Sequence, residues 1–209
     1  NLIPNKILLN REIDRKTLNE IDHTESKKVL IRSLRYLGLE KAKLYNPKKS
    51  QENELNIIIF LSYSKEKNKE LIDCFIESSK NLSFKFNLFI KFHPIKSFII
   101  PKSLKFIKLE NIHEYLHSSH IKTLCIINSY TSVGLECAHL NFPIIDKIDS
   151  DRLPFSSLEE TSKLKKVKNG EEMKEALESF FYKDLKDIHN NLNSLNFESI
   201  KKTIESIYD

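Results

Sequence analysis

The sequence predicts an α/β fold in which a mostly parallel sheet is flanked by helices. Short, unbroken apolar runs such as residues 56–61 are typical of strands that are buried on both faces. Amphipathic segments such as residues 65–80 separate these runs, and this alternation favours parallel strands joined by right-handed crossovers. Polar clusters directly follow two of the runs, at residues 91–94 and 128–132. Ligands of such sheets bind beyond the carboxyl ends of the strands, so we expect a binding site there.

The N-terminal part of the chain is predicted to be mainly helical. Thr24 can cap a helix whose apolar positions Leu30, Leu34 and Leu37 recur at helical spacing. The chain begins with Asn rather than Met, as expected of a fragment or a processed product. Four parts are expected in all: a helical segment at 1–45, a polar linker at 46–54, the α/β domain at 55–182, and amphipathic C-terminal helices at 183–209 that pack on the domain.

Within the α/β domain, the strands are expected to be short and hydrophobic, and the helices to begin at capping or acidic residues. Strands are predicted at residues 56–61, 86–92, 105–109, 123–127, 144–145 and 165–167. Helices are predicted at residues 65–80, at 111–116, directly after residue 132, and at 171–182.

The composition excludes several classes of protein. The chain has 209 residues and only three glycines, which excludes a dinucleotide fingerprint or a P-loop. The net charge of +5 comes from lysines interspersed with acids, which is typical of a solvated surface but also suits an anionic ligand or membrane face. No basic cluster with stacking residues is evident, so a nucleic-acid partner is not expected.

The cysteines and the hydrophobicity bear on the cellular compartment. Cys74, Cys125 and Cys137 lie in apolar segments without metal-ligand spacing, as expected of reduced, buried thiols in a cytoplasmic protein. No signal peptide is recognisable, and no apolar run approaches the roughly 20 residues of a membrane span.

The most informative stretch is residues 128–143, between the apolar runs 124–127 and 144–145. It is predicted to form a hydroxyl-rich turn and a short helix that stops at Pro143. The turn offers hydroxyl groups and the helix offers unpaired N–H groups, so together they can hold a phosphate. The hydroxyls belong to Ser129, Thr131 and Ser132.

Glu136 is a carboxylate in this short, otherwise apolar helix. It can accept hydrogen bonds from ribose hydroxyls, or it can close a capping box. With Ser132 as the N-cap, however, the third helical position is Leu135, so a capping box needs the helix to begin one residue later. Both interpretations stay open.

His93 follows the strand at 86–92 and is held in its turn by Pro94. This place at the end of a strand suits a ligand contact, whereas the alternative is a loop histidine with only a structural hydrogen bond. Lys91 can likewise add positive charge to the site or face solvent.

The sequence offers little support for a metal site or for a Ser/His/Asp catalytic triad. The sequence from His113 to His117 fits the H-E-x-x-H pattern with Glu114, but the predicted helix is short and no third ligand is evident. We therefore expect no metal and no cofactor. No G-x-S-x-G elbow for a Ser/His/Asp triad occurs.

Residues 89–94 and 128–138, together with 141–145, resemble the C-terminal half of GT-B glycosyltransferases. The resemblance is to the bacterial surface-polysaccharide group, which includes capsule and polysialic-acid transferases and the glycerophosphotransferases of teichoic acid synthesis. These families carry a His-Pro motif and a downstream Ser/Thr pair. The resemblance implies a Rossmann-like domain, one half of a GT-B fold, in which His93 contacts the donor phosphate or nucleotide, Ser129, Thr131 and Ser132 bind phosphate oxygens, and Glu136 lies near the ribose.

The resemblance also implies the function of a nucleotide-sugar-binding domain in surface-carbohydrate synthesis, with a CMP-linked sugar favoured. We expect a cytoplasmic protein, and the excess of positive charge leaves open a peripheral association with the inner face of the membrane. GT-B enzymes have two Rossmann-like domains, and the catalytic base usually comes from the other one. We therefore expect an N-terminal partner domain in the full-length protein, and whether this chain alone is an enzyme stays open. The alternative is a non-catalytic, GT-B-like binding or interaction module.

Overall fold

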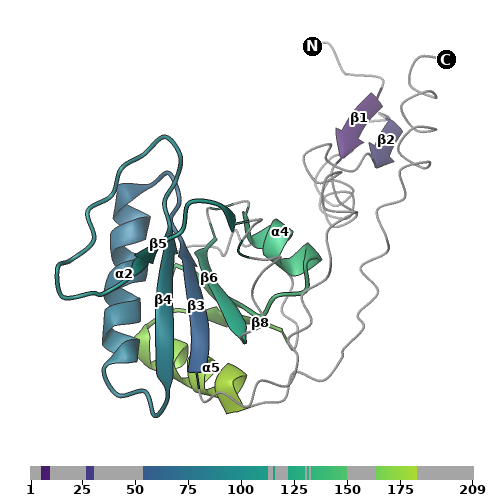
Figure 1. Cartoon of the computed structure of the whole chain (residues 1–209). Helices are drawn as coiled ribbons and strands as arrows, with labels where there is room; N and C mark the ends of the chain where they lie inside the picture. The colour runs from purple at the N-terminus through teal and green to yellow at the C-terminus, as the bar shows by residue number, and fades with distance from the viewer. Residues whose placement is uncertain are drawn as a thin grey trace. The chain divides into compact units, whose positions relative to one another are not determined.

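The computed structural model describes residues 54–112, 115, 122–129, 131, 133–149 and 163–182, and the backbone of residues 6–9 and 27–30 (Figure 1). The chain divides into two units, one of residues 1–42 and 190–209 and the other of residues 43–189. Ser132, the His113–His117 pair and the expected C-terminal helices at 183–209 lie outside the described residues.

In the first unit, β1 (Lys6–Leu9) and β2 (Lys27–Leu30) form a parallel two-stranded sheet. The sequence predicts a helical segment at 1–45, and at these two strands the prediction is wrong. Leu30 lies in a strand rather than a helix. Three leucines at helical spacing are a weak signal, and strand pairing with a distant segment overrides such a preference.

The second unit contains a six-stranded sheet in the order β5-β4-β3-β6-β7-β8, and every neighbouring pair is parallel. All six predicted strands are present, with ends within two residues of those expected. The strands are β3 (Glu54–Phe60), β4 (Lys85–Lys91), β5 (Ile107–Lys108), β6 (Thr123–Asn128), β7 (Ile144–Lys147) and β8 (Leu164–Val167). The predicted α/β, Rossmann-like fold is thereby confirmed.

The order of the strands places a topological switch point between β3 and β6. From β3 the chain moves outward to β4 and β5, then returns to add β6, β7 and β8 on the other side. This is the 3-2-1-4-5-6 order of doubly wound sheets. The connection from β4 to β5, residues 92–106, makes its crossover without a helix.

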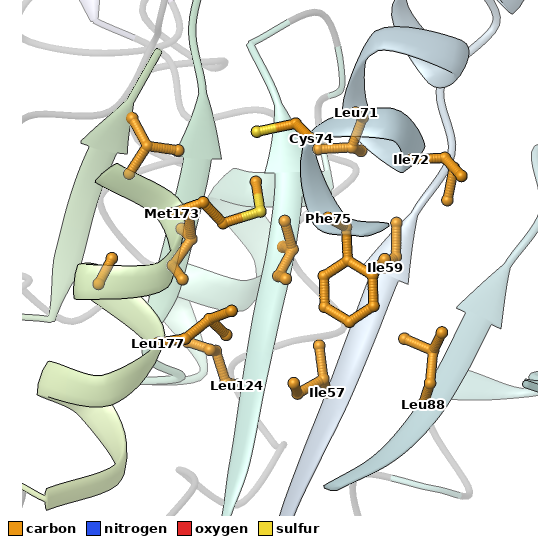
Figure 2. Close-up of a cluster of buried hydrophobic side chains, with 14 of the residues drawn as sticks. Ile57, Ile59, Leu71, Ile72, Cys74, Phe75, Leu88, Leu124, Met173 and Leu177 are labelled. Carbon is orange, nitrogen blue, oxygen red and sulfur yellow. The ribbon is translucent and has the colours of Figure 1, made fainter. Parts of the chain in front are cut away.

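Two helices cover one face of the sheet. α2 (Lys65–Ser79) and α5 (Gly170–Tyr182) pack against each other and against this face. Figure 2 shows Phe75 of α2 and Leu177 of α5 among side chains of β3, β4 and β6. Both side chains are fully buried. Each such side chain contributes about 1.5–3 kcal/mol by leaving water. The labelled members of this core are Ile57, Ile59, Leu71, Ile72, Cys74, Phe75, Leu88, Leu124, Met173 and Leu177.

The third helix, α4 (Val133–His139), connects β6 to β7. Side chains alternate along a strand, so Leu124 in the α2–α5 core and its neighbour Cys125 point to opposite faces. Cys125 interacts with Cys137 of α4, which assigns α4 to the second face. Helices therefore lie on both faces, as a parallel sheet requires.

The end of α4 is fixed by its sequence. The amide of Asn141 donates to the carbonyl of Ala138 (3.0 Å), and the amide of Phe142 donates to that of Cys137 (3.0 Å). Asn141 has a φ of 68°. This is a Schellman motif with Asn at its left-handed position, and it turns the chain into β7.

Candidate functional site

Three neighbouring strands bring the predicted motifs to one edge of the sheet. Phe60 of β3 pairs with Lys91 of β4, and Ile59 of β3 pairs with Ile126 of β6. The ladder continues beyond the strand ends, because the amide of Leu61 donates to the carbonyl of Lys91 (3.0 Å). Continued by two residues beyond the Phe60–Lys91 pair and by three beyond the Ile59–Ile126 pair, these registers set Ser62 level with both His93 and Ser129. Strands lie about 4.8 Å apart, so the His93 and Ser129 segments are separated by roughly 10 Å across the switch point.

A buried hydrogen-bond network lies at the centre of this edge. Ser62 is bonded on three sides by Asn68 of α2: its amide (2.8 Å) and hydroxyl (3.1 Å) donate to Asn68 Oδ1, and Asn68 Nδ2 donates to its carbonyl (2.8 Å). Asn128 Nδ2 donates to the Ser62 hydroxyl oxygen (3.1 Å). All three side chains are buried. The network therefore fixes how the chain leaves β3 and joins β3 to β6.

His93 is partly buried and has two contacts that orient its ring. Its Nδ1 accepts a hydrogen bond from the amide of Ile95 (3.3 Å), and its ring meets that of Tyr63 edge to face at 5.6 Å. Because Nδ1 is an acceptor, the neutral ring carries its proton on Nε2, which can donate to a ligand. Lys96 adds a positive charge, since its Nζ lies 4.6 Å from the centre of the Tyr63 ring.

The two described hydroxyls of the turn after β6 have different roles. Ser129 Oγ donates to the buried carboxylate of Asp146 in β7 (3.0 Å), so its proton is already used. Thr131 Oγ1 accepts from the amide of Val133 (3.4 Å), which leaves the hydroxyl proton of Thr131 for donation. A phosphate oxygen accepts hydrogen bonds and needs donors. Thr131 therefore suits a phosphate contact better than Ser129 does.

Glu136 is partly buried in α4 and has an interaction partner within the protein. Because α4 begins at Val133, the third helical position is Leu135 rather than Glu136. A capping box with Glu136 needs the helix to begin one residue later, so the observed start of α4 does not support that interpretation.

A lysine of α2 fixes the loop that follows β7. Lys67 Nζ contacts Glu70 (2.9 Å) and Asp149 (3.0 Å). Hydrogen bonds to Glu70 and then to Asp149 raise the pKa of Lys67 above its ordinary value. The charge of this lysine is matched by two carboxylates, so we assign it to holding the loop rather than to binding an anion.

Several residues at this edge were not predicted from the sequence. Ser62 and Tyr63 directly follow a predicted strand, as His93 does, and this position was the available signal. No signal in the sequence pointed to Asn68 or Asp146, because a polar residue in a predicted helix or strand most often lies on the surface.

Metal and thiol chemistry find no support in the described residues. Among them, no three His, Cys, Asp or Glu side chains gather as metal ligands. Burial raises the pKa of the Cys74 thiol to about 11, and burial together with Cys137 raises the pKa of Cys125. All three cysteines are buried and free, as the sequence predicts.

Comparison with known proteins adds no assignment. No protein-family model matches the chain, and no curated protein sequence matches it. In the part of the chain that the structure describes, no helix has the length and apolar character needed to cross a membrane.

Proposed function

We propose that the unit of residues 43–189 binds a nucleotide-activated sugar at the carboxyl ends of β4, β3 and β6. It would act as the donor-binding half of a GT-B-type glycosyltransferase of surface-carbohydrate synthesis. The strand order carries this proposal, because open α/β sheets bind nucleotides in the crevice at the switch point. The His-Pro and Ser/Thr motifs, on which the resemblance to these enzymes rests, follow the two strands that flank β3.

The proposed chemistry is hydrogen bonding to the donor phosphate. His93 Nε2, the Thr131 hydroxyl and the Lys96 ammonium are the donors that we assign to it. Ser132 and Glu136 keep the roles that the resemblance implies, with the Ser132 hydroxyl at the phosphate and Glu136 near the ribose. In a transfer reaction, such donors would stabilise the charge that develops on the leaving phosphate. The pairing of a His-Pro motif with Ser/Thr residues favours a CMP-linked sugar.

The general base of the transfer is assigned to a second Rossmann-like domain. We place the protein in the cytoplasm, at the inner face of the membrane. Its three free, buried thiols are compatible with such a reducing compartment.

Isothermal titration of the full chain with CMP, CDP and UDP tests the binding. We expect CMP or CDP to bind, and we expect His93→Ala and Thr131→Ala each to weaken binding roughly 10-fold, as the loss of a hydrogen bond to a charged group does. Ser83→Ala is the matched control, because Ser83 is exposed just before the amino end of β4. Absence of binding, or equal binding by all three variants, would refute the proposal.

A transfer assay on a protein with both halves then separates the enzyme from its alternative. Nucleotide binding without any transfer would identify a non-catalytic binding module.

A further inference from the structure

The connection between β4 and β5 lies in the most basic stretch of the chain. No Asp or Glu occurs from residue 78 to residue 109, whereas seven lysines do. The whole chain has a net charge of only +5, so the remainder is slightly acidic. Lysines and acids are interspersed over the rest of the chain, so the excess of positive charge is concentrated in this stretch. The lysines are Lys80, Lys85, Lys91, Lys96, Lys102, Lys105 and Lys108.

Large apolar side chains are exposed in the same connection and in the edge strand β5. Ile99 is 91% exposed, Ile95 80%, Ile107 56% and Phe106 37%. They are most of the exposed large hydrophobic residues that the described part of the chain contains. We call these residues of the connection and of the edge strand the β4–β5 patch: Ile95, Lys96, Ile99, Lys102, Lys105, Phe106 and Ile107.

Inward-facing neighbours hold this patch in place. Phe98 and Ile100, on either side of Ile99, pack against the core that contains α2, and the rings of Phe92 and Phe106 lie 6.0 Å apart. Figure 1 shows the connection as a long excursion beside α2. Ile99 is therefore exposed on a segment that is anchored by its neighbours.

Acidic side chains of the described residues do not neutralise the charges of the patch. Within the described residues, Lys96, Lys102 and Lys105 form no ion pair, and Lys108 beside the patch pairs with Glu110 (2.6 Å). The patch thus presents positive charge and apolar surface together.

We infer that the β4–β5 patch docks the protein on an anionic lipid bilayer. Phosphate headgroups complement the lysines, and the acyl region directly below them accepts the isoleucines. Nucleic acid would match the charge only, because aliphatic side chains do not stack on bases. The patch adjoins the candidate site through Lys96 and Tyr63, so a docked bilayer would lie beside that site. This inference does not depend on the proposed function.

Sedimentation with lipid vesicles tests the inference. We expect the full chain to bind vesicles of phosphatidylcholine and phosphatidylglycerol, and not vesicles of phosphatidylcholine alone. Lys102→Gln with Lys105→Gln should weaken binding roughly 25-fold, since each lysine near an anionic surface contributes about 5-fold. Ile99→Ser with Ile107→Ser should weaken it at least about 10-fold, because their burial in the acyl region is lost.

The matched control removes the same amount of positive charge at a site outside the patch. Lys168→Gln with Lys174→Gln removes two lysines outside the basic stretch and should leave vesicle binding within about 2-fold. Thermal melting confirms that the variants fold, and the isoleucine pair should still bind nucleotide as wild type does. Failure of the wild type to bind anionic vesicles, or equal loss in the control pair, overturns the inference. The inference is also overturned if the protein binds an oligonucleotide rather than vesicles and this binding depends on the lysines of the patch.

Discussion

Replacement of Asn68 by Ala should destabilise the protein strongly, because it removes the partner of a buried backbone segment at the candidate site. Asn68 makes three hydrogen bonds to Ser62, at 2.8, 3.1 and 2.8 Å, and both residues are buried. A hydrogen bond contributes about 1 kcal/mol, and a buried amide or carbonyl left without a partner costs about 1–3 kcal/mol. We therefore expect the free energy of unfolding to fall by about 3–5 kcal/mol, a large share of the stability of a typical domain.

Urea unfolding of the full chain measures this loss, through the midpoint at an unchanged slope. Ser62→Ala removes the hydroxyl with its two hydrogen bonds, to Asn68 Oδ1 and from Asn128 Nδ2, and keeps both backbone bonds to Asn68, so its cost should be about 2 kcal/mol. Asn81→Ala is the matched control at an exposed asparagine and should stay within about 0.5 kcal/mol of wild type. A loss of less than about 1 kcal/mol for Asn68→Ala would refute the reasoning, because the buried backbone of Ser62 would then not depend on Asn68.

Two further predictions concern the termination of α4 and the thiol of α2. Asn141→Ala should cost about 1–2 kcal/mol more than Asn141→Gly in urea unfolding, since both lose the amide but only Ala is strained at a φ of 68°; equal stabilities would contradict this. Cys74, with its pKa raised to about 11, should react with iodoacetamide at pH 8 roughly 200-fold more slowly than a free thiol, because its thiolate is scarce. Its rate, followed by mass spectrometry, should still be rising at about pH 10, and a plateau near pH 9 would contradict the assignment.

The strands could be predicted where burial on both faces leaves a continuous apolar run. Residues 55–60 and 123–128 are buried without interruption, and both runs were recognised. The strand expected at 105–109 shortens to Ile107–Lys108, since it lies at the sheet edge and is exposed. The helix expected around Leu30 is a strand instead, because pairing with residues 6–9 depends on contacts that local spacing does not reveal.

The candidate site could be predicted only as far as each motif follows its own strand. Position alone singled out His93 and the turn at Thr131. The partners of these residues depend on the strand order: Asn128 bonds Ser62 from 66 residues away, and Ser129 bonds Asp146 in the next strand. A sequence pattern does not encode such pairs, so the use of the Ser129 proton within the protein was not foreseen.

The two ends of the sheet differ in what their buried polar groups fix. At the amino end, the Asn56 amide donates to the Tyr115 hydroxyl (2.7 Å) and links side chains to one another. At the carboxyl end, Asn68 bonds the backbone N–H and C=O of Ser62 and so substitutes for a strand partner where the ladder stops. That bonding sets the direction of the chain at Tyr63, the residue whose ring meets both His93 and Lys96. An apolar residue in place of Asn68 would leave the buried N–H and C=O of Ser62 without partners, so Asn68 is needed for both the stability and the shape of this edge. We therefore assign to Asn68 the role of fixing the backbone at this edge of the sheet. A backbone that is fixed at the switch point favours this edge, rather than the amino end, as the binding site.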